Sequence, residues 1–379
     1  MQRLVPLLTA SLLTGCGTDQ PTTTACAEGE VSDGNHCVPE ACGTGTWGNL
    51  ETSSGTIHVD GSSPSGGDGS ESEPLTSIQD GLDAAGKSGH VVVAAGTYLE
   101  TLELGSDHIG TTLEGRCRDL VIVDGSEGKS GPLSEPETLK ASHTGVSPGS
   151  WTVSGLSIVN GQYGGVTVHS GELNLVDSTV ADSAWANIAA LGGTTNLLRV
   201  NVRDARVHES YGGASGVVVD GAVLDATDCT ISDHPGFGMY YSNASGRLEG
   251  CRIEGNRPNP DDHENYEGRG IHVRNGSTVE MIDCTVTDNR ETGVMVLDST
   301  VVLDGTTVER TGLATNGYGG RGVNLQEGAT GEISNCRIRD NMDVALYVSS
   351  SSATVTGTEI SGTLPDEALQ GIGIVGRSS

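Results

Sequence analysis

Short runs of alternating apolar and polar residues recur along the chain from about residue 165 onward. One run begins Gly-Val-x-Val or a close variant, with apolar side chains at its second and fourth positions, and its copies start at residues 165, 187, 216, 238, 270, 293, 322 and 345. A second run follows 13 to 14 residues later, and four of its copies contain a cysteine: Cys229, Cys251, Cys284 and Cys336. A period of two residues is typical of strands, and a short repeat of 22 or 23 residues fits one turn of a three-sided coil. The pattern therefore predicts an all-β solenoid.

The distances between successive first runs alternate between short and long. They are 22, 29, 22, 32, 23, 29 and 23 residues, so every second coil contains an insertion just before the Gly-Val strand. Three insertions end in similar residues, beginning at Tyr211, Tyr266 and Tyr318. The repeating unit is therefore a double coil of roughly 52 residues, and its long loops should line up along one edge. Insertions on solenoids usually lie on the binding face.

Polar residues also recur inside the predicted coils. The cysteines occupy inward strand positions, where they act as small buried hydrophobic residues. Five residues after each cysteine stand His234, Asn256, Asn289 and Asn341. Inward asparagines at one turn can stack along the axis, because each amide donates and accepts hydrogen bonds.

The region before the repeats predicts a short helix and then a buried strand. Leu75, Ile78, Leu82 and Ala85 fall at helical spacing, and an apolar run follows at residues 89–98. The order Thr76-Ser-Ile-Gln, Ala84-Ala and Val93-Ala-Ala-Gly-Thr-Tyr resembles the start of right-handed parallel β-helix proteins of the pectate-lyase-like superfamily. The resemblance implies a right-handed parallel β-helix over residues 46–379, with a short N-terminal helix that caps its open end. The superfamily includes lyases, hydrolases, epimerases, adhesins and proteins without known activity, so the resemblance implies a fold rather than a reaction.

Composition agrees with stacked coils. The chain has 57 glycines, only 3% aromatic residues and a formal net charge of −30. Coils of one size can be filled with Val, Ile, Leu and Ala, with glycine at the corners. The negative charge disfavours nucleic acid as a partner.

The first sixteen residues indicate export. Arg3 precedes an apolar run at residues 4–13, which is too short to span a bilayer. The run ends in Leu-Thr-Gly-Cys16, which resembles the bacterial lipobox. The resemblance implies a lipoprotein signal peptide at residues 1–15 and lipidation of Cys16, and Gly17 favours the outer membrane of a Gram-negative bacterium. A plain secretory signal is the alternative.

Residues 16–45 show no helix or strand period and are expected to form a cysteine-containing tether. Because an exported protein meets an oxidising compartment, we expect Cys26 to pair with Cys37 and Cys42 with Cys117. The sequence alone does not fix this connectivity.

Alternation assigns the two faces of the Gly-Val-x-Val strands. Ile271 and Val273 should point inward, and His272 and Arg274 outward. The outward column that contains His272 reads Thr167, Ala189, Val218, Tyr240, His272, Met295, Asn324 and Tyr347. Such a mixture of rings and amides suits sugar binding. The candidate binding residues are Tyr211, Tyr240, Tyr266, Tyr318 and Asn324. The alternative is an ordinary half-apolar sheet surface.

The longest insertion, residues 257–267, is the candidate for chemistry. It holds Asp261 and Asp262 and precedes outward His272 and Arg274. These four residues are the catalytic candidates if the protein is an enzyme, since carboxylates could hold Ca²⁺ and an arginine could deprotonate a uronate. The alternative is a solvated acidic loop. Arg269 and Arg321 occupy equivalent places before their strands and are candidates for bracing the loops.

The catalytic signatures of polygalacturonases and alginate epimerases are missing. We therefore expect a lipid-anchored cell-envelope protein that binds polysaccharide or another envelope partner without catalysis. One alternative is a polysaccharide lyase or hydrolase, and another is a structural spacer or adhesin.

Overall fold

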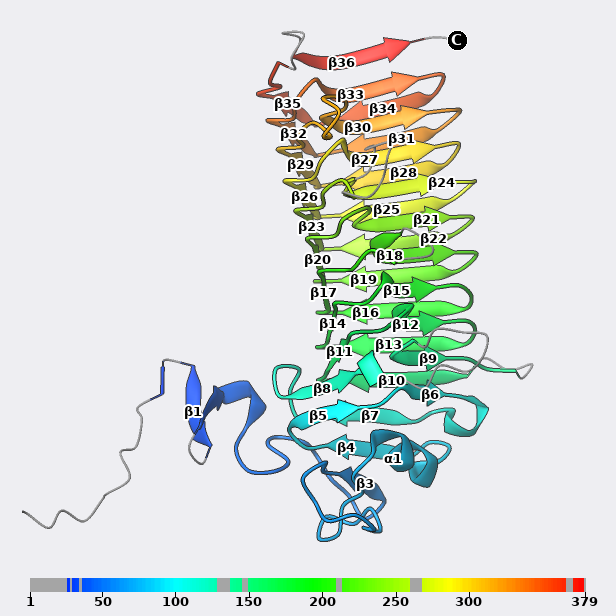
Figure 1. The fold of residues 1–379 in the computed structure, drawn as a ribbon. Helices are drawn as coiled ribbons and strands as arrows, with labels where there is room; N and C mark the ends of the chain where they lie inside the picture. The colour runs from blue at the N-terminus through cyan, green and yellow to red at the C-terminus, as the bar shows by residue number, and fades with distance from the viewer. Residues whose placement is uncertain are drawn as a thin grey trace, which may run out of the picture.

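The computed structural model describes residues 26–27, 29–33, 36–127, 137–144, 149–208, 213–259, 268–365 and 371–377. Its body is a stack of coils in which three parallel sheets run along the long axis (Figure 1). Each coil contributes one strand to sheet 1, then one to sheet 2, then one to sheet 3. The solenoid predicted from the repeats is confirmed.

Among the described residues, sheet 1 has twelve strands and the other two sheets have eleven each. Sheet 1 contains β3 (Thr56–Val59), β4 (His90–Val93), β7 (Thr112–Gly115), β10 (Ser150–Ser154), β13 (Glu172–Val176), β16 (Thr194–Leu198), β19 (Val223–Thr227), β22 (Ser245–Glu249), β25 (Thr278–Ile282), β28 (Thr300–Asp304), β31 (Thr330–Ser334) and β34 (Ser352–Thr356). Sheet 2 contains β5 (Gly96–Leu99), β8 (Val121–Asp124), β11 (Ser157–Val159), β14 (Thr179–Ala181), β17 (Asn201–Arg203), β20 (Thr230–Ser232), β23 (Arg252–Glu254), β26 (Thr285–Thr287), β29 (Thr307–Glu309), β32 (Arg337–Arg339) and β35 (Glu359–Ser361). Sheet 3 contains β6 (Leu102–Leu104), β9 (Leu139–Ala141), β12 (Gly164–Val168), β15 (Trp185–Ala190), β18 (Ala214–Asp220), β21 (Met239–Ser242), β24 (Ile271–Arg274), β27 (Thr292–Leu297), β30 (Arg321–Gln326), β33 (Val344–Ser349) and β36 (Ile372–Arg377).

Sharp corners between sheets explain the recurrent Asp, Asn and Gly residues. Between sheets 1 and 2, the residue before each core cysteine has a positive φ, as at Asp228 (53°) and Asn335 (55°). Asp, Asn and Gly tolerate this left-handed conformation better than other residues. The three longest insertions of the repeats all run from a sheet 2 strand to a sheet 3 strand, from β17 to β18, β23 to β24 and β29 to β30. They therefore leave the solenoid at the same corner, as predicted.

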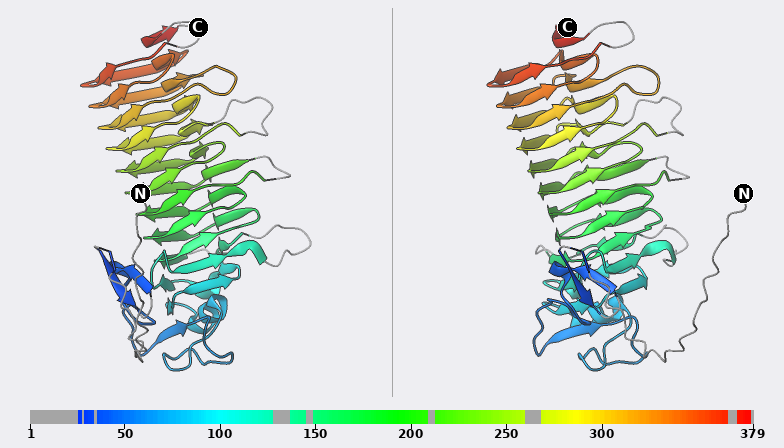
Figure 2. Two further views of the ribbon diagram at one scale, coloured as in Figure 1. Left: turned by 60° about the vertical axis from the view of Figure 1, so that its left-hand side comes forward. Right: turned by 90° about the vertical axis from the view of Figure 1, so that its left-hand side faces the viewer.

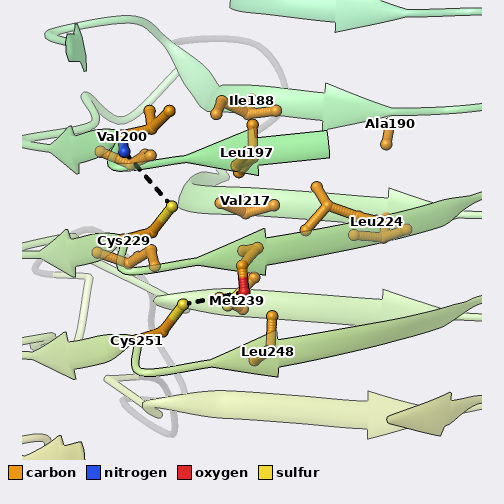
Figure 3. Packing of buried hydrophobic residues seen from close by; sticks show 14 of the residues in the cluster. Ile188, Ala190, Leu197, Val200, Val217, Leu224, Cys229, Met239, Leu248 and Cys251 are labelled. Carbon is orange, nitrogen blue, oxygen red and sulfur yellow. Dashed lines mark hydrogen bonds between the residues drawn. The ribbon is translucent and has the colours of Figure 1, made fainter. Parts of the chain in front are cut away.

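The core consists of in-register apolar columns. Val217 pairs with Met239 and Met239 with Ile271 in sheet 3, and all three are fully buried. Cys229 and Cys251 lie next to these columns (Figure 3), and all four core cysteines are 1–2% exposed. Their inward placement is confirmed, and burial raises the pKa of the Cys336 thiol.

The predicted asparagine ladder is present in the core. The Oδ1 atom of Asn289 accepts hydrogen bonds from the Asn256 amide nitrogen Nδ2 (2.8 Å) and from the Asn256 backbone N–H (3.2 Å). Asn289 Nδ2 donates to the Ile253 carbonyl (3.0 Å). A Cβ placed on Gly270, the first residue of its Gly-Val-x-Val run, would lie 2.9 Å from Asn289 Nδ2. The repeated glycine therefore leaves the room that the side chain of the repeated asparagine occupies.

The predicted cap helix is α1 (Ile78–Ala85), which covers the first coil (Figure 1). Ile78 and Leu82 are fully buried against the core. Ser77 caps the helix, and the Glu100 carboxylate accepts hydrogen bonds from the backbone N–H groups of Ile78 (2.8 Å) and Gln79 (3.0 Å). These bonds satisfy donors that a helix start leaves free.

The segment before the solenoid folds back along the first coils (Figure 2). It contains an antiparallel hairpin of β1 (Glu30–Asp33) and β2 (His36–Pro39), followed by the single 3₁₀ turn η1 (Glu40–Cys42); two further 3₁₀ turns, η2 (Ser106–His108) and η3 (Gly125–Glu127), lie in the first coils. The sequence period did not indicate the hairpin, because four-residue strands are too short to show one.

Two disulfides, Cys26–Cys37 and Cys42–Cys117, join the pairs of cysteines that we expected. The second fastens the segment to the solenoid. Buried Arg116 reinforces it by donating to the carbonyls of Cys42 (3.3 Å) and Gly43 (2.6 Å) and to Asp33 Oδ2 (2.6 Å). A hydrogen bond from the Gly45 N–H and the Arg116 guanidinium lower the pKa of Asp33.

Cys16 lies outside the described residues. Within them, no helix is long and apolar enough to cross a membrane.

Candidate functional site

The outward face of sheet 3 brings together side chains from successive coils. The parallel register pairs Val218 with Tyr240, Tyr240 with His272 and His272 with Met295. Adjacent strands lie about 4.8 Å apart, so side chains in one outward column contact those of the next coil.

Three rings form the centre of this face. His272 lies 5.3 Å from the Phe237 ring and 5.5 Å from the Tyr240 ring, both edge-on, and the Phe237 and Tyr240 rings are 5.4 Å apart. Phe237 and Tyr240 are partly exposed, whereas His272 is only 4% exposed. The buried His272 ring therefore packs against the two more exposed rings of Phe237 and Tyr240.

An ion pair holds this ring cluster in place. Arg269 forms a two-pronged salt bridge with Glu291 of the next coil, in which Nη2 donates to Oε1 at 2.9 Å. Arg269 Nη1 also donates to His272 Nδ1 (2.9 Å), and its guanidinium carbon is 5.7 Å from the centre of the Phe237 ring. Arg269 therefore holds the ring cluster, whereas the insertion that it was expected to brace lies largely outside the described residues.

His272 is uncharged in this setting. Burial, together with the positive charges of Arg269 and Arg274, lowers the pKa of His272 to about 2. Nδ1 accepts from Arg269, so the ring proton is on Nε2, which is buried and has no hydrogen-bond partner in the described part of the chain. A buried neutral imidazole with so low a pKa is a poor general acid or base at neutral pH.

A second pair of rings lies nearer the N-terminus, with Tyr163 three coils and Trp185 two coils before Tyr240. Tyr163 stacks on Trp185 with ring centres 4.8 Å apart and planes 17° apart. Trp185 packs on a small outward apolar cluster of Ala186, Ala189 and Val218. Tyr163 and Trp185 are partly exposed, so they add aromatic surface to the same face.

The arginine–acid arrangement is repeated two coils later. Arg321 occupies the place of Arg269, and its Nε lies 3.6 Å from Asp343 Oδ2 of the next coil. Its guanidinium carbon is 4.1 Å from the centre of the Tyr347 ring, a distance at which the cation and the ring attract. The structure thus confirms that Arg269 and Arg321 take equivalent positions.

The predicted site residues differ in where they lie. Tyr240 and His272 belong to the ring cluster, and Arg274 lies in the neighbouring outward column with a hydrogen bond to Asn275 Oδ1 (3.3 Å). Asn324 is 2% exposed and accepts a hydrogen bond from Gln326 Nε2 (2.9 Å), so its amide is covered. Tyr318, on the insertion before β30, is 72% exposed. Four candidates lie outside the described residues: Tyr211, Asp261, Asp262 and Tyr266.

Phe237, Trp185 and Glu291 were not recognised from the sequence. Phe237 directly precedes the glycine of its Gly-Val-x-Val run, as Arg269 does in the next coil. Trp185 and Glu291 stand one residue earlier, two positions before the first residue of their runs. Aligning both positions across the coils would have identified the residues beside the outward column. Alternation alone does not, because these positions lie at the corner where the strand begins.

Metal binding by the long insertion is not tested. In the ranges described above, no group of three or more His, Cys, Asp and Glu residues is arranged to hold a metal ion. The predicted Ca²⁺ ligands Asp261 and Asp262 lie outside those ranges.

A groove of about 700 Å³ lies elsewhere, between the N-terminal segment and the solenoid. Two of its arginines are already paired: Arg116 with Asp33 and Arg199 with Asp177. The first pair joins the N-terminal segment to the solenoid, whereas the second joins two neighbouring coils of the solenoid.

Comparison with known proteins supports the fold. Residues 189–361 match the family model described as "Right handed beta helix region". A search of curated proteins found no match.

Solved structures with similar folds include three polysaccharide-related or phage proteins. Pectate lyase Pel9A is 14% identical, with a TM-score of 0.56 over 80% of this chain and 78% of its own. The tailspike of Acinetobacter phage vb_AbaP_AS12 is 10% identical, with a TM-score of 0.54 over 82% of this chain and 59% of its own. Alginate lyase from Paenibacillus sp. str. FPU-7 is 13% identical, with a TM-score of 0.50 over 84% of this chain and 99% of its own.

Such low identities establish a shared fold and not a shared activity. With the repeats, the three parallel sheets and the family match in agreement, the chain is a right-handed parallel β-helix repeat protein.

Proposed function

We propose that this protein binds a polysaccharide along the outward face of sheet 3 and does not cleave it. The observation that carries the proposal is the set of partly exposed rings on this face: Tyr163, Trp185, Phe237 and Tyr240. They extend from the coil of β12 to that of β21, about 14 Å at one strand spacing per coil. Aromatic faces pack against the C–H surfaces of sugars, and adjacent polar groups bind hydroxyls.

The non-catalytic part of the proposal rests on the groups beside the rings. Arg269 is committed to Glu291 and His272, and His272 is buried and neutral. Neither is poised to take a proton from a substrate. Among the described candidates, Arg274 is the one left for a lyase reaction, and the test below includes it.

A panel of acidic and neutral polysaccharides, with and without Ca²⁺, tests the proposal on the chain from Gly17 to Ser379, which includes every described residue. Binding is measured by affinity electrophoresis, and turnover by new reducing ends and by the absorbance of unsaturated ends. We expect retention without products, weakened several-fold to about tenfold by Tyr240→Ala or Tyr163→Ala. Leu99→Ala is the matched control, because Leu99 is 54% exposed on sheet 2 and should not affect retention.

Product formation that is lost in Arg274→Ala or Asp262→Ala would replace the binding proposal with a polysaccharide lyase or hydrolase. No retention and no product across the panel would leave the spacer or adhesin interpretation.

We also propose that the protein is held in the cell envelope, at the outer membrane, by lipid on Cys16. The Leu-Thr-Gly-Cys16 sequence after a short apolar run supports this. Radiolabelled palmitate should enter the wild-type chain and not Cys16→Ser, which should leave the membrane fraction. Equal labelling of both chains would refute the anchor.

A further inference from the structure

His272, at the centre of the ring cluster, carries a hydrogen-bond donor that no oxygen or nitrogen in the described part of the chain satisfies. Arg269 Nη1 donates to His272 Nδ1 (2.9 Å), so the ring proton is on Nε2. Nε2 is buried, and the residue as a whole is 4% exposed. A buried donor without an acceptor costs free energy in the unliganded protein, and a ligand that supplies the acceptor recovers it.

The two neighbouring rings are at most weak acceptors. The centres of the Phe237 and Tyr240 rings lie 5.3 and 5.5 Å from that of His272, with interplanar angles of 68° and 84°. An aromatic face accepts an N–H group much more weakly than an oxygen does. The Nε2–H group of His272 therefore still gains from an oxygen acceptor.

The donor is fixed, whereas the side chains that cover it can move. The salt bridge with Glu291 of the next coil holds Arg269, and Arg269 in turn holds the imidazole through Nδ1. Phe237 and Tyr240 are partly exposed, and they meet the imidazole through ring contacts. Exposed side chains change rotamer rapidly, so a ligand group that displaces one of these rings can reach Nε2.

The surroundings of the donor select the kind of acceptor. The next coil places Met295 beside His272 in the outward column, and the Phe237 and Tyr240 rings lie on its other side. A hydroxyl group would accept the hydrogen bond, but it would bring a donor of its own into these mostly apolar surroundings. A carbonyl oxygen accepts without adding a donor, and an apolar group attached to it can pack against the thioether and the rings.

A carboxylate is the rival acceptor, because the positive charges of Arg269 and Arg274 act on His272. However, Glu291 already balances the charge of Arg269. The whole chain has a formal net charge of −30, which repels polyanionic chains. A neutral carbonyl acceptor is therefore favoured over a carboxylate.

We propose that the glycan bound by this face carries N-acetyl groups, and that His272 Nε2 donates to an acetamido oxygen while the acetyl methyl group packs against Phe237 and Met295. An amide carbonyl is a strong neutral acceptor. The N–H of a trans amide points away from its carbonyl oxygen, so it can remain in water. This inference rests on the glycan binding proposed above and names the class of sugar.

Calorimetric titration of the chain from Gly17 to Ser379 with chitohexaose and with cellohexaose tests this proposal. Both hexamers are neutral β-1,4-linked chains, and they differ in the group at C2, which is acetamido in the first and hydroxyl in the second. We expect chitohexaose to bind about tenfold more tightly, which corresponds to one hydrogen bond of about 1.4 kcal/mol. Polygalacturonate provides the carboxylate arm of the comparison.

His272→Phe keeps a buried ring and removes the donor, so the two hexamers should then bind with similar affinity. His272→Gln keeps an acceptor for Arg269 and a donor for the ligand, so it should retain most of the preference. Tyr163→Ala is the control, because it removes a ring four coils away on the same face. It should weaken both hexamers in proportion and leave their ratio unchanged, as a merely structural role of His272 would also do. Melting temperatures show whether each variant is folded.

The outcomes separate this inference from the proposed function. Equal affinities of the wild type for the two hexamers, or a preference that survives His272→Phe, would overturn the inference and leave glycan binding intact. Tighter binding of polygalacturonate than of chitohexaose would do the same, and so would retention of other polysaccharides with no binding of either hexamer. If no glycan is bound at all, the proposed function fails together with the inference.

Discussion

Replacing Asn289 with alanine tests whether the internal amide ladder stabilises the solenoid. Asn289 is fully buried, and its side chain makes three hydrogen bonds: two from Asn256 to Oδ1 and one from Nδ2 to the Ile253 carbonyl. Alanine removes all three and leaves two donors and one acceptor buried without partners. At about 1–1.5 kcal/mol each, the loss amounts to roughly 3–5 kcal/mol of unfolding free energy, a large part of the stability of a typical domain.

The measurement is urea unfolding followed by circular dichroism, with hydrogen exchange to show where protection is lost. Because each coil contacts mainly its neighbours, exchange should increase first in β23 and β26. Asn196→Ala is the matched control: Asn196 bonds to Asn174 Oδ1 (2.9 Å) on the outward side of sheet 1, where water can replace the bond, so the change should cost less than about 1 kcal/mol. Equal losses in the two variants would refute the reasoning.

Three further predictions concern charged and titratable groups. Burial lowers the pKa of His234, in the asparagine ladder, from 6.5 to about 4. Between these pH values the unfolded chain binds more protons than the folded chain, so the free energy of unfolding falls as the pH falls from 6.5 to 4. His234→Asn should remove up to about 3 kcal/mol of that loss, as measured by unfolding titrations at each pH. Arg116→Ala should raise the hydrogen exchange and protease sensitivity of residues 36–50 at a cost of about 2–4 kcal/mol, and unchanged protection would contradict its clamping role. Arg269→Ala should lower the free energy of unfolding by about 1–3 kcal/mol, because it removes the ion-pair partner of Glu291, whose side chain is only 14% exposed in the wild type. Arg274→Ala should cost under about 0.5 kcal/mol, and similar effects of both changes would argue against the brace.

The periodic parts of this fold could be predicted because every coil must bury the same strand positions and turn the same corners. Within each coil, a strand with two inward residues, a left-handed corner residue and a buried amide follow one another at similar spacing. The sequence could therefore predict that Asn256 and Asn289 lie inside the solenoid and stack along its axis. The cap helix was predictable for the same reason, since Ile78 and Leu82 follow a helical period. The hairpin of β1 and β2 was not, because disulfides and Arg116 hold it and no period reports such contacts.

The outward face was predictable only in part. Alternation placed Tyr240 and His272 on the outward side, but it could not show that His272 is buried there. Its burial depends on Phe237 and Arg269, which come from the corner before each strand, and on pairing with Glu291 of the next coil. Contacts between residues of different coils at irregular positions are not visible in a pattern that describes one coil at a time.

The ion pairs of Arg269 and Arg321 point the same way along the chain: each arginine binds an acid supplied by the coil that follows it. The amide of Asn256 likewise donates to the Asn289 oxygen of the next coil. These polar groups of one coil therefore gain their partners only after the next coil has formed. If folding proceeds from the N-terminus, each newly added coil would therefore stabilise the coil before it, and the fully ordered part of the solenoid would lag one coil behind the last coil formed.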